Sequence, residues 1–102
     1  GYLLADQPWF VQFLEGEHVR VRNTLERIKG DPRHTSIVVL QSREVNFRSF
    51  SDWSMGGIVR NLDVQEIYLR HGVAGPLDPL KAKPAMLLEL ALDLQAFAAE
   101  HK

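Results

Sequence analysis

The chain contains no cysteine, which excludes disulfide bridges, thiolate metal sites and cysteine nucleophiles. Neither sign of charge dominates, because 12 basic residues face 13 acidic ones and leave a formal net charge of −1. A nucleic-acid-binding domain usually presents a basic surface, so this balance favours no nucleic-acid partner. No apolar run is long enough to span a membrane, and no secretory signal opens the sequence. We therefore expect a cytoplasmic protein without a membrane partner.

Motifs of the common catalytic sites are also missing. The sequence has no G-x-S-x-G elbow, no phosphate-cradling glycine loop and no metalloprotease motif. His18, His71 and His101 show no metal-ligand spacing with one another or with a carboxylate pair. What is present is the composition of one small folded domain, because 102 residues with 45% hydrophobic content bury one modest core. We therefore expect neither an enzyme nor a metal site.

Short apolar runs bounded by turn residues predict four strands. We place them at residues 2–5, 9–15, 37–40 and 54–59, and the first two form a hairpin. Alternate side chains of 9–15 point to opposite faces, and both sets are mainly apolar, with Gln12 as the polar exception inside the run. We expect that strand to be central and covered on both sides. Strand 37–40 is apolar on both faces as well.

Helical spacing of apolar residues predicts helices at residues 17–29, 62–71 and 84–100. Asn61 is a suitable N-cap for the second helix, and Gly72 closes it. The last helix is apolar almost all the way round, and so broad an apolar surface usually covers more than one neighbour. We expect this helix to pack on the sheet and on a second subunit. The alternative is a helix that packs wholly within its own chain.

Gln12 is the most informative single residue, because its amide lies within an apolar run. A buried amide without hydrogen-bond partners costs about 1–3 kcal/mol, so Gln12 needs a partner. That partner is either protein or ligand. The plainer interpretation is a structural glutamine bonded to the backbone or to another side chain.

The other candidate residues also have plain interpretations when each is taken alone. Arg27 and Asp31 are four residues apart on the predicted helix, where a surface ion pair contributes only about 0.2–0.5 kcal/mol. His34 at the helix exit fits an ordinary solvated loop residue. Trp53 and Met55 alone would be core side chains. Only the combination of these residues favours a ligand.

Four short segments occur in a distinctive order and spacing. They are residues 10–16 (FVQFLEG), 26–28 (ERI), 31–34 (DPRH) and 50–55 (FSDWSM). Together they resemble the BLUF family of flavin-binding blue-light sensors. The tail segment 67–72 (IYLRHG) is also similar to that of short, stand-alone members, in which two helices follow the flavin domain and the protein forms a homo-oligomer.

The resemblance implies an α+β fold, with a ferredoxin-like mixed sheet, helices on one face, and two C-terminal helices packing on the other. It implies a flavin domain over residues 1–60 and a C-terminal helical extension over residues 61–102. FAD is the implied cofactor, with FMN as the alternative. The implied partners are the flavin, further copies of the chain bound through the C-terminal helices, and a downstream protein.

The resemblance also implies a role for each polar candidate. Gln12 matches the glutamine that hydrogen-bonds the flavin ring. Arg27 and Asp31 match polar residues near the polar edge of the ring. Arg33 and His34 match residues close to the ring and to the ribityl-phosphate side of the cofactor.

The implied activity is signalling rather than turnover. In the family, light moves an electron and a proton from a tyrosine to the flavin and back, and the hydrogen bonds of the glutamine, here Gln12, rearrange. Trp53 and Met55 match the pair that exchanges contacts with that glutamine. This pair would relay the change into the last strand and the C-terminal helices, which is a local switch acting on a larger element.

Family members carry a further strand and helix ahead of the part that this sequence resembles. That segment holds the photoactive tyrosine and a ring-binding asparagine, and neither Tyr2 nor Tyr68 matches that tyrosine. We expect this segment to precede the sequence given. The alternatives are that another chain fills its place, or that the protein is a light-insensitive, flavin-free oligomerising module on a BLUF-like scaffold.

Overall fold

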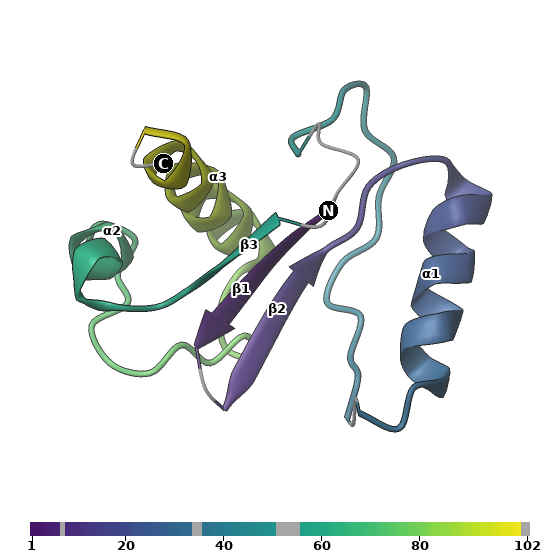
Figure 1. Cartoon of the computed structure of the whole chain (residues 1–102), viewed down its shortest axis with the longest axis horizontal. Helices are drawn as coiled ribbons and strands as arrows, with labels where there is room; N and C mark the ends of the chain where they lie inside the picture. Colours follow the sequence, from purple (N-terminus) through teal and green to yellow (C-terminus); the bar gives the residue numbers. More distant parts are fainter. Residues whose placement is uncertain (7, 34–35, 51–55, 101–102) are drawn as a thin grey trace.

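The computed structural model describes residues 1–6, 8–33, 36–50 and 56–100. Its elements follow one another in the order β1 (Tyr2–Asp6), β2 (Trp9–Phe13), α1 (His18–Gly30), β3 (Gly56–Val59), a 3-10 turn (Leu62–Val64), α2 (Gln65–Arg70) and α3 (Pro84–Glu100) (Figure 1). The predicted hairpin and the first and last predicted helices are confirmed. The second predicted helix is divided into the 3-10 turn and α2.

The strands form a mixed sheet in the order β2-β1-β3. β1 and β2 are antiparallel neighbours, whereas β3 pairs in parallel with β1. A parallel pair needs a long crossover connection, and α1 lies within that connection. Helices pack against this sheet, so the predicted α+β, ferredoxin-like fold class is confirmed.

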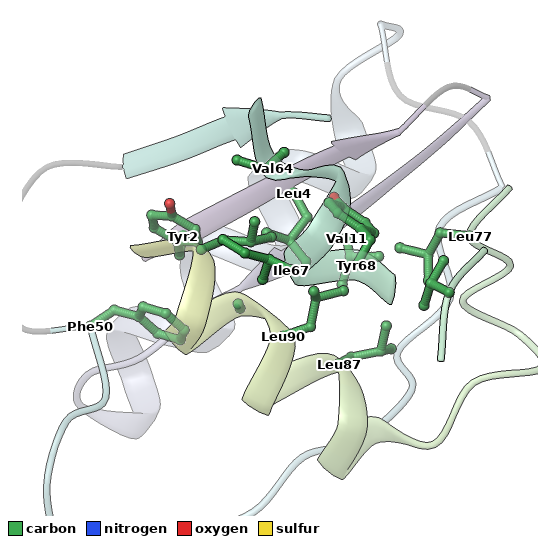
Figure 2. Close-up of a cluster of buried hydrophobic side chains, with 13 residues drawn as sticks. Tyr2, Leu4, Val11, Phe50, Val64, Ile67, Tyr68, Leu77, Leu87 and Leu90 are labelled. Carbon is green, nitrogen blue, oxygen red and sulfur yellow. The ribbon is translucent and has the colours of Figure 1, made fainter. Parts of the chain in front are cut away.

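One face of the sheet forms the core with α2 and α3 (Figure 2). Alternate strand positions share a face, and the pairing of β1 with β2 places Leu4 directly beside Val11, with Tyr2 further along the same face. All three side chains are buried. The buried residues of α3 recur every three or four positions and therefore lie on one stripe of the helix. They are Leu87, Leu90, Ala91 and Leu94.

The 3-10 turn and α2 complete this core. Their buried residues are Val64, Ile67 and Tyr68. The Asn61 side chain accepts a hydrogen bond from the backbone N–H of Asp63 at 2.9 Å, which confirms the predicted N-cap. After α2, Gly72 has a φ of 81°, a conformation that glycine adopts without strain. The predicted end of this helical region is therefore confirmed as well.

The prediction that the second strand is central is wrong. β1 is the central strand, and β2 lies at the edge of the described sheet. Phe10 of β2 is 62% exposed. Apolar side chains also occur on protein surfaces, so an apolar face does not by itself reveal whether a second layer covers it.

The predicted strand at residues 37–40 is not formed. These residues belong to the described part of the chain and have irregular backbone, with Val38 59% and Val39 52% exposed. A strand is stabilised by packing against cross-strand neighbours, which local β-propensity does not supply. The last predicted strand, 54–59, is present as β3 over Gly56–Val59, and its first two residues lie outside the described residues.

α1 forms where the helical periodicity predicts it, but none of its residues is buried. Its apolar stripe of Val21, Leu25 and Ile28 is only half-buried. In Figure 1 this helix stands beyond β2, on the side away from α2 and α3. α3 therefore provides most of the helix packing on the sheet. Neither α1 nor any other helix in the described ranges is long and apolar enough to cross a membrane.

Candidate functional site

The sheet face opposite the core is open to solvent over much of its area. The strand register assigns six residues to this open face: Leu3, Ala5, Phe10, Gln12, Gly57 and Val59. Phe10 and Val59 are 62% and 66% exposed, and Gln12 is exposed too. The open face therefore presents apolar side chains from both outer strands, β2 and β3, together with one amide.

Gln12 lies on β2 directly opposite Leu3 of β1. The expectation that its amide is buried is wrong, because the residue is exposed. Strand alternation explains the difference, since Val11 and Phe13 point to the core and Gln12 points the other way. An amide carries both a hydrogen-bond donor and an acceptor, and this one stands on a face that a ligand can reach.

Glu15 makes a long-range contact that the sequence did not reveal. Its carboxylate accepts two backbone hydrogen bonds, from Ser49 at 2.8 Å and from Phe50 at 2.6 Å. Hydrogen bonds to an ionised carboxylate are stronger than neutral ones. The two donors are 34 and 35 residues away along the chain, so no local pattern could indicate them. In the sequence, Glu15 is recognisable only as a single acidic residue that directly follows an apolar run.

Phe50 is anchored by its ring as well as by its backbone. It is 2% exposed, and its ring stacks on Tyr2 with 5.2 Å between centroids. The ring of Phe13 lies 5.3 Å away in a tilted arrangement. Glu15 and these two rings thus fix the chain at residue 50 against the end of the β-hairpin.

Two of the predicted polar residues come together at the end of α1. The Nη2 atom of Arg33 lies 2.6 Å from Oδ2 of Asp31, and the Arg33 backbone N–H donates to Oδ1 at 2.9 Å. The hydrogen bond to Asp31 raises the pKa of Arg33. The Arg33 side chain is nevertheless 83% exposed, so its guanidinium also faces solvent. Arg27 donates to the Thr24 hydroxyl at 3.4 Å, within α1.

His34, Trp53 and Met55 lie outside the residues that the structure describes. Their predicted roles stay predictions. Trp53 and Met55 follow the anchored Phe50 in sequence and precede β3.

The sequence model of the BLUF family, described as sensors of blue-light using FAD, matches residues 1–56, which is more than half of the chain. The chain belongs to the BLUF family. This is a family of blue-light sensors, and its cofactor is FAD. The matched range contains every predicted flavin-site residue, from Gln12 to Met55.

The curated relatives are much longer proteins. The photoactivated adenylate cyclase subunit beta of Euglena gracilis is 33% identical over 55 residues, which cover 54% of this chain and 6% of that protein. The subunit beta of Euglena longa gives the same values. The photoactivated adenylate cyclase subunit alpha of Euglena gracilis is also 33% identical over 55 residues and is covered to 5%. This chain thus spans only about a twentieth of the length of these relatives.

The chemistry of the open face fits a flavin. A flavin ring is flat and apolar on its faces, with hydrogen-bonding nitrogen and oxygen atoms along its edge. Phe10 and Val59 offer apolar surface, and the Gln12 amide stands on the same face. Such a combination of apolar lining and few polar groups is typical of cofactor sites. The Arg33 side chain is exposed, but its Nε and Nη2 atoms already bond Asp31, so only the rest of the guanidinium can donate to phosphate oxygens.

Proposed function

We propose that this protein is a cytoplasmic, non-enzymatic blue-light sensor that binds FAD on the open face. The observation that carries the proposal is the BLUF match over residues 1–56, a range that includes Gln12. The exposed apolar side chains of Phe10 and Val59 support this location, because cofactor sites bury most of their ligand against apolar surface.

Gln12 senses the state of the flavin in this proposal. Its amide can donate and accept, so it can bond the nitrogen and oxygen atoms of the ring edge in alternative patterns. Light changes which pattern is favoured, and a poorly solvated pocket holds either pattern firmly. Trp53 and Met55 exchange contacts with Gln12 and pass the change to β3, the element that follows them in sequence.

The end of α1 binds the polar side of the cofactor. Asp31 holds the Arg33 side chain through hydrogen bonds of 2.6–3.1 Å to its Nε and Nη2 atoms. The side chain is 83% exposed, and the rest of its guanidinium donates to a phosphate. Arg27, on the same helix, and His34, next in sequence, complete this polar side.

The C-terminal helices carry the output. Residues 1–60 act as the flavin domain and residues 61–102 as the extension, through which copies of the chain assemble and a downstream protein is contacted. The shared core of β1, β2, α2 and α3 supports this arrangement, because side chains of the sheet and of the extension pack directly together (Figure 2).

The test is an absorption spectrum of the full natural chain with FAD, recorded before and after blue light. We expect a yellow protein with a small, reversible red shift. Gln12→Leu removes the amide and should abolish the shift while the protein stays folded. Gln41→Leu alters an exposed glutamine outside the strands and should retain the shift.

Two results would contradict parts of this proposal separately. A colourless protein that takes up no FAD would contradict the sensor function, and a stable oligomer in that sample would favour a flavin-free module. A Gln12→Leu variant with an unchanged red shift would leave FAD binding intact and contradict the role of Gln12.

A further inference from the structure

Arg60 directly follows β3 and continues its pairing with β1, because its backbone N–H donates to the Ala5 carbonyl at 2.8 Å. Its guanidinium Nη1 donates to Oδ2 of Asp6, the last residue of β1, at 2.7 Å. The two side chains are only 11% and 16% exposed. This ion pair joins the same ends of two neighbouring parallel strands.

The Arg60 guanidinium also reaches the C-terminal extension. Its Nη1 donates to the Gly75 carbonyl at 2.8 Å, and its Nε donates to the side chain of Gln65, at the start of α2, at 3.1 Å. It lies 4.3 Å from the ring centroid of Tyr68, a fully buried residue of α2. At this distance a guanidinium is attracted to the face of an aromatic ring. One side chain therefore contacts β1, α2 and the loop before α3.

Asp6 is bonded from the extension as well. Its Oδ2 accepts the backbone N–H of Leu77 at 3.1 Å, and Leu77 is 3% exposed at the edge of the core (Figure 2). The other ion pairs of the described residues differ, since each has at least one side chain that is more than a third exposed. An exposed pair contributes little, whereas breaking a shielded pair leaves a poorly solvated charge. The Asp6–Arg60 pair is thus a shielded charged contact between the sheet and the C-terminal extension.

We propose that Arg60 is a positioning residue through which a change in β3 is passed to α2 and α3. This inference rests on the proposed function, in which the change begins at Gln12 and reaches β3. The guanidinium is planar and its donors point in fixed directions. When the end of β3 moves, Arg60 cannot keep its bonds to Asp6 and to the extension unless α2 and the following loop move with it. Docking of the extension is therefore coupled to the position of β3.

The test is hydrogen–deuterium exchange of the full chain with FAD, in the dark and under blue light. Wild-type protein should show a light-minus-dark difference in peptides covering residues 61–100. Arg60→Lys keeps the charge but loses the planar set of guanidinium donors. It should reduce the light-minus-dark exchange difference by roughly threefold or more. The red shift should stay unchanged, since Arg60 lies on neither the open face nor the end of α1. A purely structural role would change exchange in the dark and leave the light-minus-dark difference intact.

Arg70→Lys is the matched control, because Arg70 is an exposed arginine in the last turn of α2. It should retain both the red shift and the exchange difference. If Arg60→Lys releases the extension in the dark, Gln65→Ala provides the milder change. Gln65→Ala removes the hydrogen bond from Arg60 to Gln65 and leaves the Asp6–Arg60 pair in place. The light-minus-dark exchange difference should then fall while the extension stays docked.

The failures of the two proposals are distinguishable. A wild-type chain without a red shift contradicts the proposed function and this inference with it. A wild-type chain with a red shift but no exchange difference in residues 61–100 overturns the inference alone. So does a full-size difference in Arg60→Lys, or in a docked Gln65→Ala.

Discussion

Tyr68 illustrates how burial sets the chemistry of one side chain. It is fully buried, and its hydroxyl has no hydrogen-bond partner among the described residues. Burial, and to a smaller extent the charge of Asp6, raises the pKa of Tyr68 to about 12, while Arg60 acts in the opposite direction. The folded state therefore favours the neutral phenol.

This pKa predicts a specific alkaline sensitivity. The phenol ionises near pH 10 when the chain is unfolded but only near pH 12 when it is folded, so stability is complete below pH 10 and falls as the pH rises towards 12. Between pH 9 and 11, wild-type protein should lose about 1 kcal/mol more unfolding free energy than Tyr68→Phe. Urea unfolding at each pH measures this.

The Tyr68→Phe variant also carries its own control. At pH 7 it should be within about 1 kcal/mol of wild type, because the removed hydroxyl has no partner among the residues described. Parallel pH profiles for the two proteins would contradict the assignment of the alkaline loss of stability to Tyr68. Tyr2, whose pKa burial also raises, is present in both proteins.

At the scale of elements, α3 holds the sheet while α1 contributes little to the core. Leu90 of α3 is 0% exposed, so Leu90→Ala should create a cavity and lower the unfolding free energy by about 2–5 kcal/mol. Val19 of α1 is 64% exposed, so Val19→Ala should change the unfolding free energy by less than about 0.5 kcal/mol. Urea unfolding followed by circular dichroism compares the two.

A second α3 variant keeps this prediction testable if Leu90→Ala does not fold. Leu90→Met conserves volume and should cost less than about 1.5 kcal/mol. Equal losses in Val19→Ala and Leu90→Ala would show that α3 does not dominate the packing, and a large loss in Leu90→Met would show that the site does not tolerate a change of shape.

For the whole molecule, the exposed leucines of the extension bear on assembly. Leu62, Leu69 and Leu80 are 92%, 51% and 56% exposed, whereas no large exposed hydrophobic residue of the described chain lies on α3. Exposed apolar side chains of this size can be buried by contact with another chain. We predict a homo-oligomer, whose mass measured by light scattering is a multiple of the mass of one chain.

Substitution of the extension should separate the copies. Leu69→Glu places a charge in the expected contact and should shift the mass to that of the monomer. Phe47→Glu changes a residue that is 79% exposed outside the extension and should leave the oligomer intact. A wild-type chain that stays monomeric at high concentration would contradict assembly through the extension.

Local patterns determined the parts of this protein that depend on near neighbours. The hairpin, α1, α3, the Asn61 cap and the Gly72 ending follow from periodicity and from residues a few positions apart. The motif containing Gln12 likewise placed the chain in its family, as the match over residues 1–56 confirms. These signals are contained within short segments, so the sequence reveals them directly.

The tertiary structure alone decided which surfaces are covered. It put β2 at an edge, left Gln12 exposed, and gave residues 37–40 no strand partner within the described chain. It also joined Glu15 to Phe50 and Asp6 to Arg60, over 35 and 54 residues of sequence. Such contacts form only when distant segments are brought together by packing of the core, and their free energy depends on burial that no single segment specifies.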